Sequence, residues 1–138
     1  MRQFLYSNLN CQDAKDNISL LKKLGITDYV IDYEPDADLI SSLNLWGIRQ
    51  YYRIKICYQD INNPNYAEIE AELIKAKNLN CYSFAIDAEP YSGSDIWKID
   101  AEKAHVFGQK LAELIKKYYP DTEIVIYPEN LYGDKYEY

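Results

Sequence analysis

Apolar runs and amphipathic helical patterns alternate along the whole chain of 138 residues. Short runs rich in Tyr, Val, Ile and Phe predict β-strands, because these side chains suit a buried, pleated surface. Between the runs, apolar residues recur at three- and four-residue spacing, which is typical of helices with one buried face. The expected strands cover residues 4–7, 26–33, 48–58, 81–87 and 123–127. The expected helices cover residues 13–24, 36–46, 63–77 and 100–119.

Glycine, asparagine and proline mark the expected helix ends. Gly25 and Gly47 follow the first two helical patterns, where glycine commonly provides the C-terminal stop. Asn63 and Pro64 predict a helix start, with an Asn cap and a proline in the first turn. Pro120 predicts the end of the last helix.

The order of these elements, β-α-β-α-β-α-β-α-β, predicts an α/β fold with a parallel sheet and right-handed crossovers. The repeat averages about 30 residues, which is the size of one unit in a (β/α)₈ barrel. The expected fold is therefore (βα)₄β, a half or truncated TIM barrel, and the alternative is a five-stranded flavodoxin-like open sheet. One domain over residues 1–138 is expected from the length.

The third expected strand carries charge where a parallel sheet is usually apolar. Arg53 and Lys55 alternate with Ile54 and Ile56. A strand covered on both faces normally reads as a continuous apolar run. Either this strand lies at the edge of the sheet, or its two cations point toward a cluster of carboxylates and favour their ionised form.

Composition narrows the function classes. The net charge is −7 and the pI is about 4.7, so the chain has no basic stripe with which to bind nucleic acid. No long uncharged apolar stretch and no signal peptide is evident, which predicts no membrane span and, by default, a cytoplasmic location. Cys11, Cys57 and Cys81 lack metal-ligand spacing and are expected to be reduced packing cysteines. No cofactor is expected.

The string Ile-Asp-x-Glu-Pro occurs twice, at residues 31–35 and 86–90. Each copy closes an apolar run and precedes a helical pattern, so each is expected where a strand ends and a βα loop begins. Residues two apart on a strand point to the same side. Each copy therefore presents two carboxylates at the carboxyl end of a strand, where α/β folds place their active sites.

The second copy, with Asp87 and Glu89, is the better catalytic candidate. A glycosidase needs one carboxylic acid near the leaving oxygen and a second carboxylate that stabilises or traps the cationic sugar. Two carboxylates held close push their pKa values apart, which leaves one of them protonated as the acid. Asp87 and Glu89, at the end of an inner strand, supply such a pair.

The segment from Phe84 to Tyr91 resembles the fourth-strand region of (β/α)₈ glycoside hydrolases. In the family 18 chitinases this strand ends in Asp-x-Asp-x-Glu, where the Glu is the acid and the Asp two before it assists the substrate's acetamido group. Glu89 and Asp87 match these two positions, whereas Ala85 replaces the first Asp. The family 25 lysozymes also use an Asp-x-Glu pair in a barrel.

A second resemblance is to the large clan of retaining glycosidases, whose fourth strand ends in Asn-Glu-Pro. Glu89 and Pro90 match this pattern, and Ala88 replaces the Asn. The nucleophile of that clan comes from the seventh strand, and only five strands are expected here. The resemblance covers the fourth-strand segment specifically and the order of elements loosely. It implies a glycosidase-like barrel rather than any single family.

Other residues at the same rim are expected to bind substrate. Asp32 and Glu34 of the first copy are interpreted as binding or auxiliary carboxylates, whereas Asp36 and Asp38 fit the N-terminal end of a helix. Tyrosines follow or end all five expected strands, and sugar rings stack on such side chains. They are Tyr6, Tyr33, Tyr58, Tyr91 and Tyr127. The expected substrate-binding residues are Asp32, Glu34, Tyr58, Tyr91, Tyr127 and Glu129.

Three hypotheses of different classes follow. The first is a glycoside hydrolase, or a fragment of one, that cleaves a glycosidic bond with the strand-end carboxylate pair. The second is a non-catalytic carbohydrate-binding or interaction module. The third is a divalent-metal site formed by Asp32, Glu34, Asp87 and Glu89, because oxygen ligands suit Mg²⁺ or Ca²⁺. The expected partners are a carbohydrate and, through open sheet edges, a second copy of the chain.

Overall fold

A computed structural model describes residues 1–7, 11–31, 36–56, 59–81, 83–87 and 101–127. Its strands are β1 (Phe4–Ser7), β2 (Asp28–Ile31), β3 (Arg49–Lys55), β4 (Ser83–Asp87) and β5 (Glu123–Tyr127). Its helices are α1 (Cys11–Asp16), α2 (Ile18–Lys23), α3 (Ala37–Leu45), α4 (Tyr66–Asn78) and α5 (Ala101–Tyr118). The expected alternation of strands and helices is confirmed.

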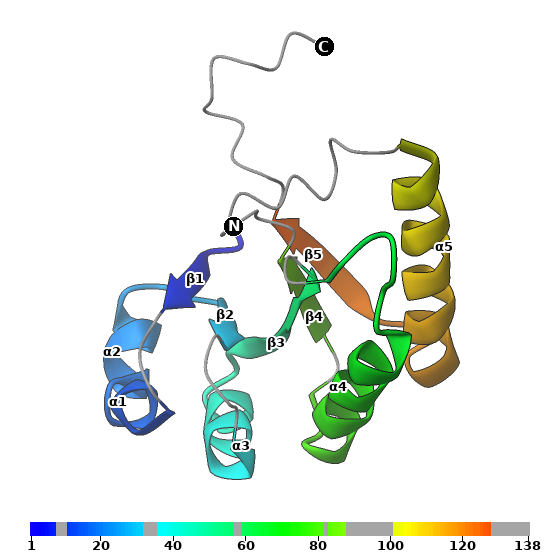
Figure 1. Cartoon of the computed structure of the whole chain (residues 1–138). Helices are drawn as coiled ribbons and strands as arrows, with labels where there is room; N and C mark the ends of the chain where they lie inside the picture. Colours follow the sequence, from blue (N-terminus) through cyan, green and yellow to red (C-terminus); the bar gives the residue numbers. More distant parts are fainter. Residues whose placement is uncertain (8–10, 32–35, 57–58, 82, 88–100, 128–138) are drawn as a thin grey trace, which may run out of the picture.

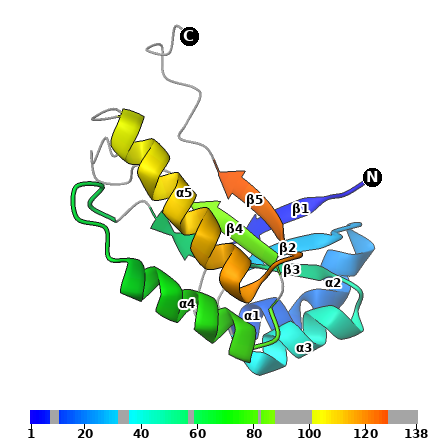
Figure 2. The same ribbon diagram turned by 90° about the vertical axis from the view of Figure 1, so that its right-hand side faces the viewer.

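The described strands form one sheet in the order β1-β2-β3-β4-β5, with every neighbouring pair parallel. The sheet curls, and all of the labelled helices lie on its convex side (Figures 1 and 2). This is the arrangement of half a (β/α)₈ barrel. The flavodoxin-like alternative is wrong, because that fold has strand order 2-1-3-4-5 and carries helices on both faces of its sheet.

The two faces of the sheet have different cores. Tyr52, Ile54, Phe84 and Ile86 belong to the large buried cluster formed with the helices on the convex side. The residues between them point to the concave side, where Val30, Tyr51 and Ala85 form a small separate cluster. The period of two along each strand therefore decides which side chains reach the inside of the half-barrel.

Three helices pass into the next strand through the same C-terminal turn. Gly25 and Gly47 have φ angles of +79° and +65°, and Asn80 has a φ angle of +58°. In each case the residue after the turn donates its backbone N–H to the carbonyl five residues earlier, as Ile48 does to Leu43 at 2.9 Å. This is the Schellman motif, which glycine and asparagine favour because they tolerate the left-handed conformation.

The helix starts depend on side-chain caps. Asp36 is the N-cap of α3 and accepts a hydrogen bond from the backbone N–H of Leu39, which confirms its interpretation as a helix-start residue. Asn65 is the N-cap of α4 and accepts from the N–H of Glu68 at 3.2 Å. The predicted start of this helix at Asn63 is therefore wrong by two residues. Three polar residues occur in succession around Pro64, and tertiary packing chooses among them.

The predicted helix over residues 13–24 is also wrong as one continuous element. It is divided at Asn17 into α1 and α2. The side chain of Asn17 donates to the carbonyl oxygen of Asp13 at 2.8 Å. Asparagine competes for backbone groups in this way, which makes it a poor residue for a helix interior.

The last helix, α5, buries Phe107, Leu111 and Ile115 against the sheet. Directly after it, the hydroxyl of Tyr119 donates to the carbonyl oxygen of Leu73 in α4 at 3.0 Å. The Tyr119 ring also packs edge-on against Phe84 of β4, with centroids 4.5 Å apart. No helix among the described residues is long and apolar enough to cross a membrane.

Candidate functional site

Asp87 is the last residue of β4, at the carboxyl end of the sheet. Its neighbours in register are Lys55 on β3 and Tyr127 on β5. Asp87 is only 1% exposed. The predicted position of this carboxylate, at a strand end on the concave face, is therefore what the structure shows.

The guanidinium of Arg53 forms an ion pair with the carboxylate of Asp87. The side chain of Arg53 is 6% exposed and that of Asp87 is 1% exposed, so the pair is almost completely removed from water. An ion pair in such a place requires both partners to be charged, because an isolated buried charge is very unfavourable. The guanidinium of Arg53 is thus the counter-charge of the Asp87 carboxylate at this buried end of the strand.

The position of β3 decides between the two interpretations of its cations. β3 pairs with β2 on one side and with β4 on the other, so the edge-strand interpretation is wrong. Arg53 points toward a carboxylate, as the second interpretation expected. Lys55 lies two residues after Arg53 on the same face of β3. It is exposed, and Asp87 is its neighbour in register on β4.

The opposite end of the concave face carries a second charged group, which we call the amino-end network. It consists of Arg2, Asp28, Arg49, Tyr51 and Glu123. Arg2 donates hydrogen bonds to Asp28, Tyr51 and Glu123, and Arg49 forms an ion pair with Glu123. The Tyr51 hydroxyl is also 3.3 Å from a carboxylate oxygen of Asp28. Because Arg2 precedes β1 and Glu123 begins β5, the network spans the concave face from one described edge strand to the other.

Burial and hydrogen bonds shift the pKa values of three groups in this network. Burial by itself would raise the pKa of Asp28, but hydrogen bonds from Arg2 and Thr27 outweigh it, so this pKa lies below its usual value. Burial raises the pKa of Tyr51, which keeps the phenol neutral. The hydrogen bond from Arg2 is the main reason that the pKa of Glu123 is lowered.

The sequence interpretation missed the amino-end network. Arg49 and Tyr51 could have been found, because they continue the alternation of Arg53 and Lys55 on β3. Arg2 and Glu123 gave no such signal, since they lie 121 residues apart in the chain and meet only when the sheet curls.

Several predicted site residues lie outside the described residues. They are Asp32, Tyr33, Glu34, Tyr58, Glu89, Tyr91 and Glu129. Tyr127 ends β5 as expected, beside Asp87 in register, but only its backbone is described. The same holds for Tyr6 on β1. Their roles at the rim stay predictions.

His105 and Cys81 do not lie at the carboxyl ends of the strands. His105 is exposed on α5 and lies 2.9 Å from the side chain of Gln109. Cys81 is buried, and this burial raises the pKa of its thiol to about 11, as befits a packing cysteine. Among the described residues, no group of three His, Cys, Asp or Glu side chains is placed to hold a metal ion. Three of the four residues of the metal hypothesis lie outside this part of the chain.

No protein-family model matches the sequence, and no curated protein matches it. Solved structures do match the fold. A mutant of the Thermobaculum terrenum O-GlcNAc hydrolase superposes with a TM-score of 0.69 at 12% identity, over 94% of this chain and 34% of that protein. An exo-β-D-glucosaminidase superposes with a TM-score of 0.51 at 14% identity, over 88% of this chain and 15% of that protein.

These matches show the fold alone, because the sequence identities are low. Both neighbours are glycoside hydrolases, and the chain corresponds to part of each of them. The chain spans 34% of the length of the first and 15% of the second. The comparisons therefore support a parallel half-barrel of the (β/α)₈ type, as the sheet topology does.

Proposed function

We propose that the chain provides the strand-end carboxylate pair of a glycoside hydrolase, with Glu89 as general acid and Asp87 as its partner. The observation that carries this proposal is the Arg53–Asp87 ion pair, buried at the carboxyl end of β4. This is the end of the strands at which (β/α)₈ enzymes do their chemistry. The fold likeness to two glycoside hydrolases supports the same conclusion.

In this mechanism Glu89 protonates the glycosidic oxygen while the bond from that oxygen to the anomeric carbon breaks. Positive charge then develops on the sugar, and the fixed negative charge of Asp87 stabilises it. Water completes the hydrolysis. The ion pair with Arg53 holds the Asp87 side chain in place, so that the two carboxyl groups have separate roles.

The other rim residues are proposed to bind the substrate. Tyr58, Tyr91 and Tyr127 would stack on sugar rings, because each offers a flat apolar face with a hydroxyl at its edge. Asp32, Glu34 and Glu129 would accept hydrogen bonds from sugar hydroxyls.

The test is hydrolysis of a panel of 4-nitrophenyl glycosides by the wild-type chain and by Glu89→Gln. The substitution removes the proton donor but keeps the shape of the side chain, so turnover should fall by a factor of about 10² to 10⁴. Asp87→Asn should also lose turnover. Glu113→Gln on the exposed surface of α5 is the matched control and should keep full activity. Equal turnover by wild type and Glu89→Gln would contradict the proposal.

We also propose that activity depends on a second copy of the chain. Among the described strands, β1 and β5 each pair with one neighbour, so each leaves a row of backbone groups at an edge. Edge strands of this kind pair readily with another chain. Light scattering on a sizing column should therefore show a discrete dimer, and a monomer at all concentrations would contradict it.

A second candidate function is carbohydrate binding without turnover. The observation that favours it is the near-complete burial of Asp87, whose charge Arg53 already neutralises. Isothermal calorimetry with the sugars of the same panel separates the two functions. Saturable heat in the absence of released nitrophenol would favour the binding module. The divalent-metal alternative has less support, because a guanidinium already occupies the one described carboxylate of that set.

A further inference from the structure

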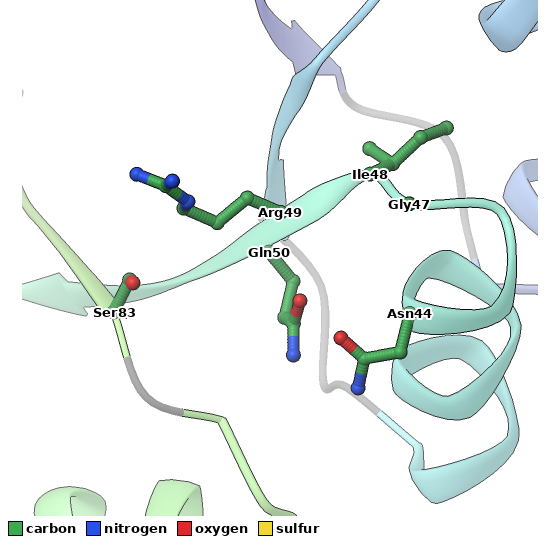
Figure 3. A pocket seen from close by; sticks show the side chains of 6 residues that line it. All are labelled: Asn44, Gly47, Ile48, Arg49, Gln50 and Ser83. Carbon is green, nitrogen blue, oxygen red and sulfur yellow. The ribbon is translucent and has the colours of Figure 1, made fainter.

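A pocket of about 370 Å³ opens at the amino end of the sheet, on the opposite rim from Asp87. It lies between the C-terminal end of α3 and the first residues of β3 and β4 (Figure 3). Its lining consists of Asn44, Gly47, Ile48, Arg49, Gln50 and Ser83. Asp87 is the fourth residue after Ser83 along β4, which is about 13 Å along a strand. The pocket is thus separate from the carboxylate site.

Gln50 is the informative residue of this pocket. It is 5% exposed, yet its side-chain amide forms no hydrogen bond with any described residue. It alternates with Arg49 and Tyr51 along β3, so it points away from the concave face and toward the helices. Figure 3 shows its amide on the same side of β3 as the amide of Asn44. The Asn44 side chain likewise has no hydrogen-bond partner among the described residues.

The amide of Gln50 opens into the pocket, where a ligand or water can pair with it. The pocket is far larger than the space of one water molecule, which is about 30 Å³. Its volume falls in the range of small-molecule sites, about 300–1,000 Å³. The size and the polar lining together suit a small polar molecule.

The chemistry of the lining selects the class of ligand. Primary amides both donate and accept hydrogen bonds, which matches the hydroxyl group. The one charged residue of the lining, Arg49, is engaged by Glu123, and Figure 3 shows its side chain on the other side of β3 from Gln50. We propose that this pocket binds a small neutral molecule rich in hydroxyl groups, of the size of a monosaccharide, through Gln50 and Asn44.

The experiment is a ¹H–¹⁵N NMR titration of the full chain with D-glucose and with N-acetyl-D-glucosamine. The side-chain NH₂ signals of Gln50 and Asn44 report directly on the proposed contacts. With at least one of the two sugars, both signals should shift in a saturable way. Gln50→Met and Asn44→Leu should each weaken binding by at least about tenfold, which corresponds to about 1.4 kcal/mol.

The control variant is Gln109→Met on α5, which removes an exposed glutamine far from the pocket and should leave the affinity unchanged. Asn44 is exposed, so Asn44→Leu keeps the test valid even if Gln50→Met fails to fold. Absence of a saturable shift with both sugars would mean that the pocket holds water only, and would overturn the proposal. Binding retained in both pocket variants would overturn it as well.

The pocket and the carboxylate site can be tested independently. Glu89→Gln, which should abolish hydrolysis, should leave the titration of Gln50 unchanged. Gln50→Met should leave the hydrolysis of nitrophenyl glycosides unchanged. The hydrolysis assay therefore tests the proposed function, and the NMR titration tests the pocket, so that the failure of one does not obscure the other.

Discussion

At the amino end of the concave face, five side chains share a branched network. At the carboxyl end, Arg53 and Asp87 form a buried ion pair. The side chains of Arg2, Arg49 and Glu123 are 43%, 50% and 39% exposed. Those of Arg53 and Asp87 are 6% and 1% exposed. The same strand, β3, contributes cations to both ends.

The difference in solvent access separates a structural role from a functional one. The ion pairs of Glu123 with Arg2 and Arg49 are exposed, so water screens them and each contributes little. Asp28 is the buried carboxylate of the same network. A buried pair is costly to form and costly to break. In (β/α)₈ proteins the amino ends of the strands serve stability and the carboxyl ends carry the chemistry, and the roles that we propose for the two groups follow this division.

The largest effect is expected from Arg53→Met. This substitution leaves the buried carboxylate of Asp87 without its cation, which should lower the free energy of unfolding by about 3–5 kcal/mol. Urea denaturation followed by circular dichroism measures the loss. The double variant Arg53→Met, Asp87→Leu should recover most of it, because neither charge then remains buried. A loss of about 1 kcal/mol or less would show that the pair behaves as an exposed one does.

A smaller effect, with a pH signature, is expected at Asp28. Its pKa is lowered on folding from the ordinary value of 3.8, so its contribution is present above that value and is lost as the pH falls through the folded pKa. Unfolding free energy measured from pH 6 downward should therefore drop below about pH 4. Asp28→Asn should cost about 1–3 kcal/mol at neutral pH and flatten this part of the curve. If the free energy of unfolding of Asp28→Asn falls below about pH 4 as steeply as that of the wild type, other carboxylates cause the pH dependence.

The smallest effect is expected from Arg49→Ala. Arg49 pairs with Glu123 at the exposed part of the network, so the free energy of unfolding should change by less than about 1 kcal/mol. Raising the salt concentration should shrink the difference between wild type and variant, because screening already weakens the pair. Thermal melts at low and high salt provide the measurement. A large effect that salt does not alter would place Arg49 with the buried charges.

Much of the fold could be predicted because its signals are local. Gly25 and Gly47 lie at the ends of amphipathic patterns and adopt the left-handed turns that glycine favours. The strand-end position of Asp87 follows from an apolar run and its period of two. The start of α4 and the break at Asn17 could not be predicted, because several neighbouring polar residues can each serve as a cap or a break.

Only part of the candidate site could be predicted from the sequence. The sequence identified Asp87 as a strand-end carboxylate and Arg53 as an inward cation or an edge residue, without deciding between the two. Gln50 gave no signal at all, because a glutamine in a strand is unremarkable until its surroundings are known. Its position in the lining of the pocket is a property of the packed structure.

The sequence by itself determined the order of the elements and the alternation that sends Arg49, Tyr51, Arg53 and Lys55 to one side of β3. Both depend on spacings within a few residues. Only the tertiary structure decided that β3 is central, that Arg53 meets Asp87 and that Arg2 reaches Glu123. These contacts join strands that are distant in the chain, so they depend on strand order, register and the curl of the sheet, which local spacing does not encode.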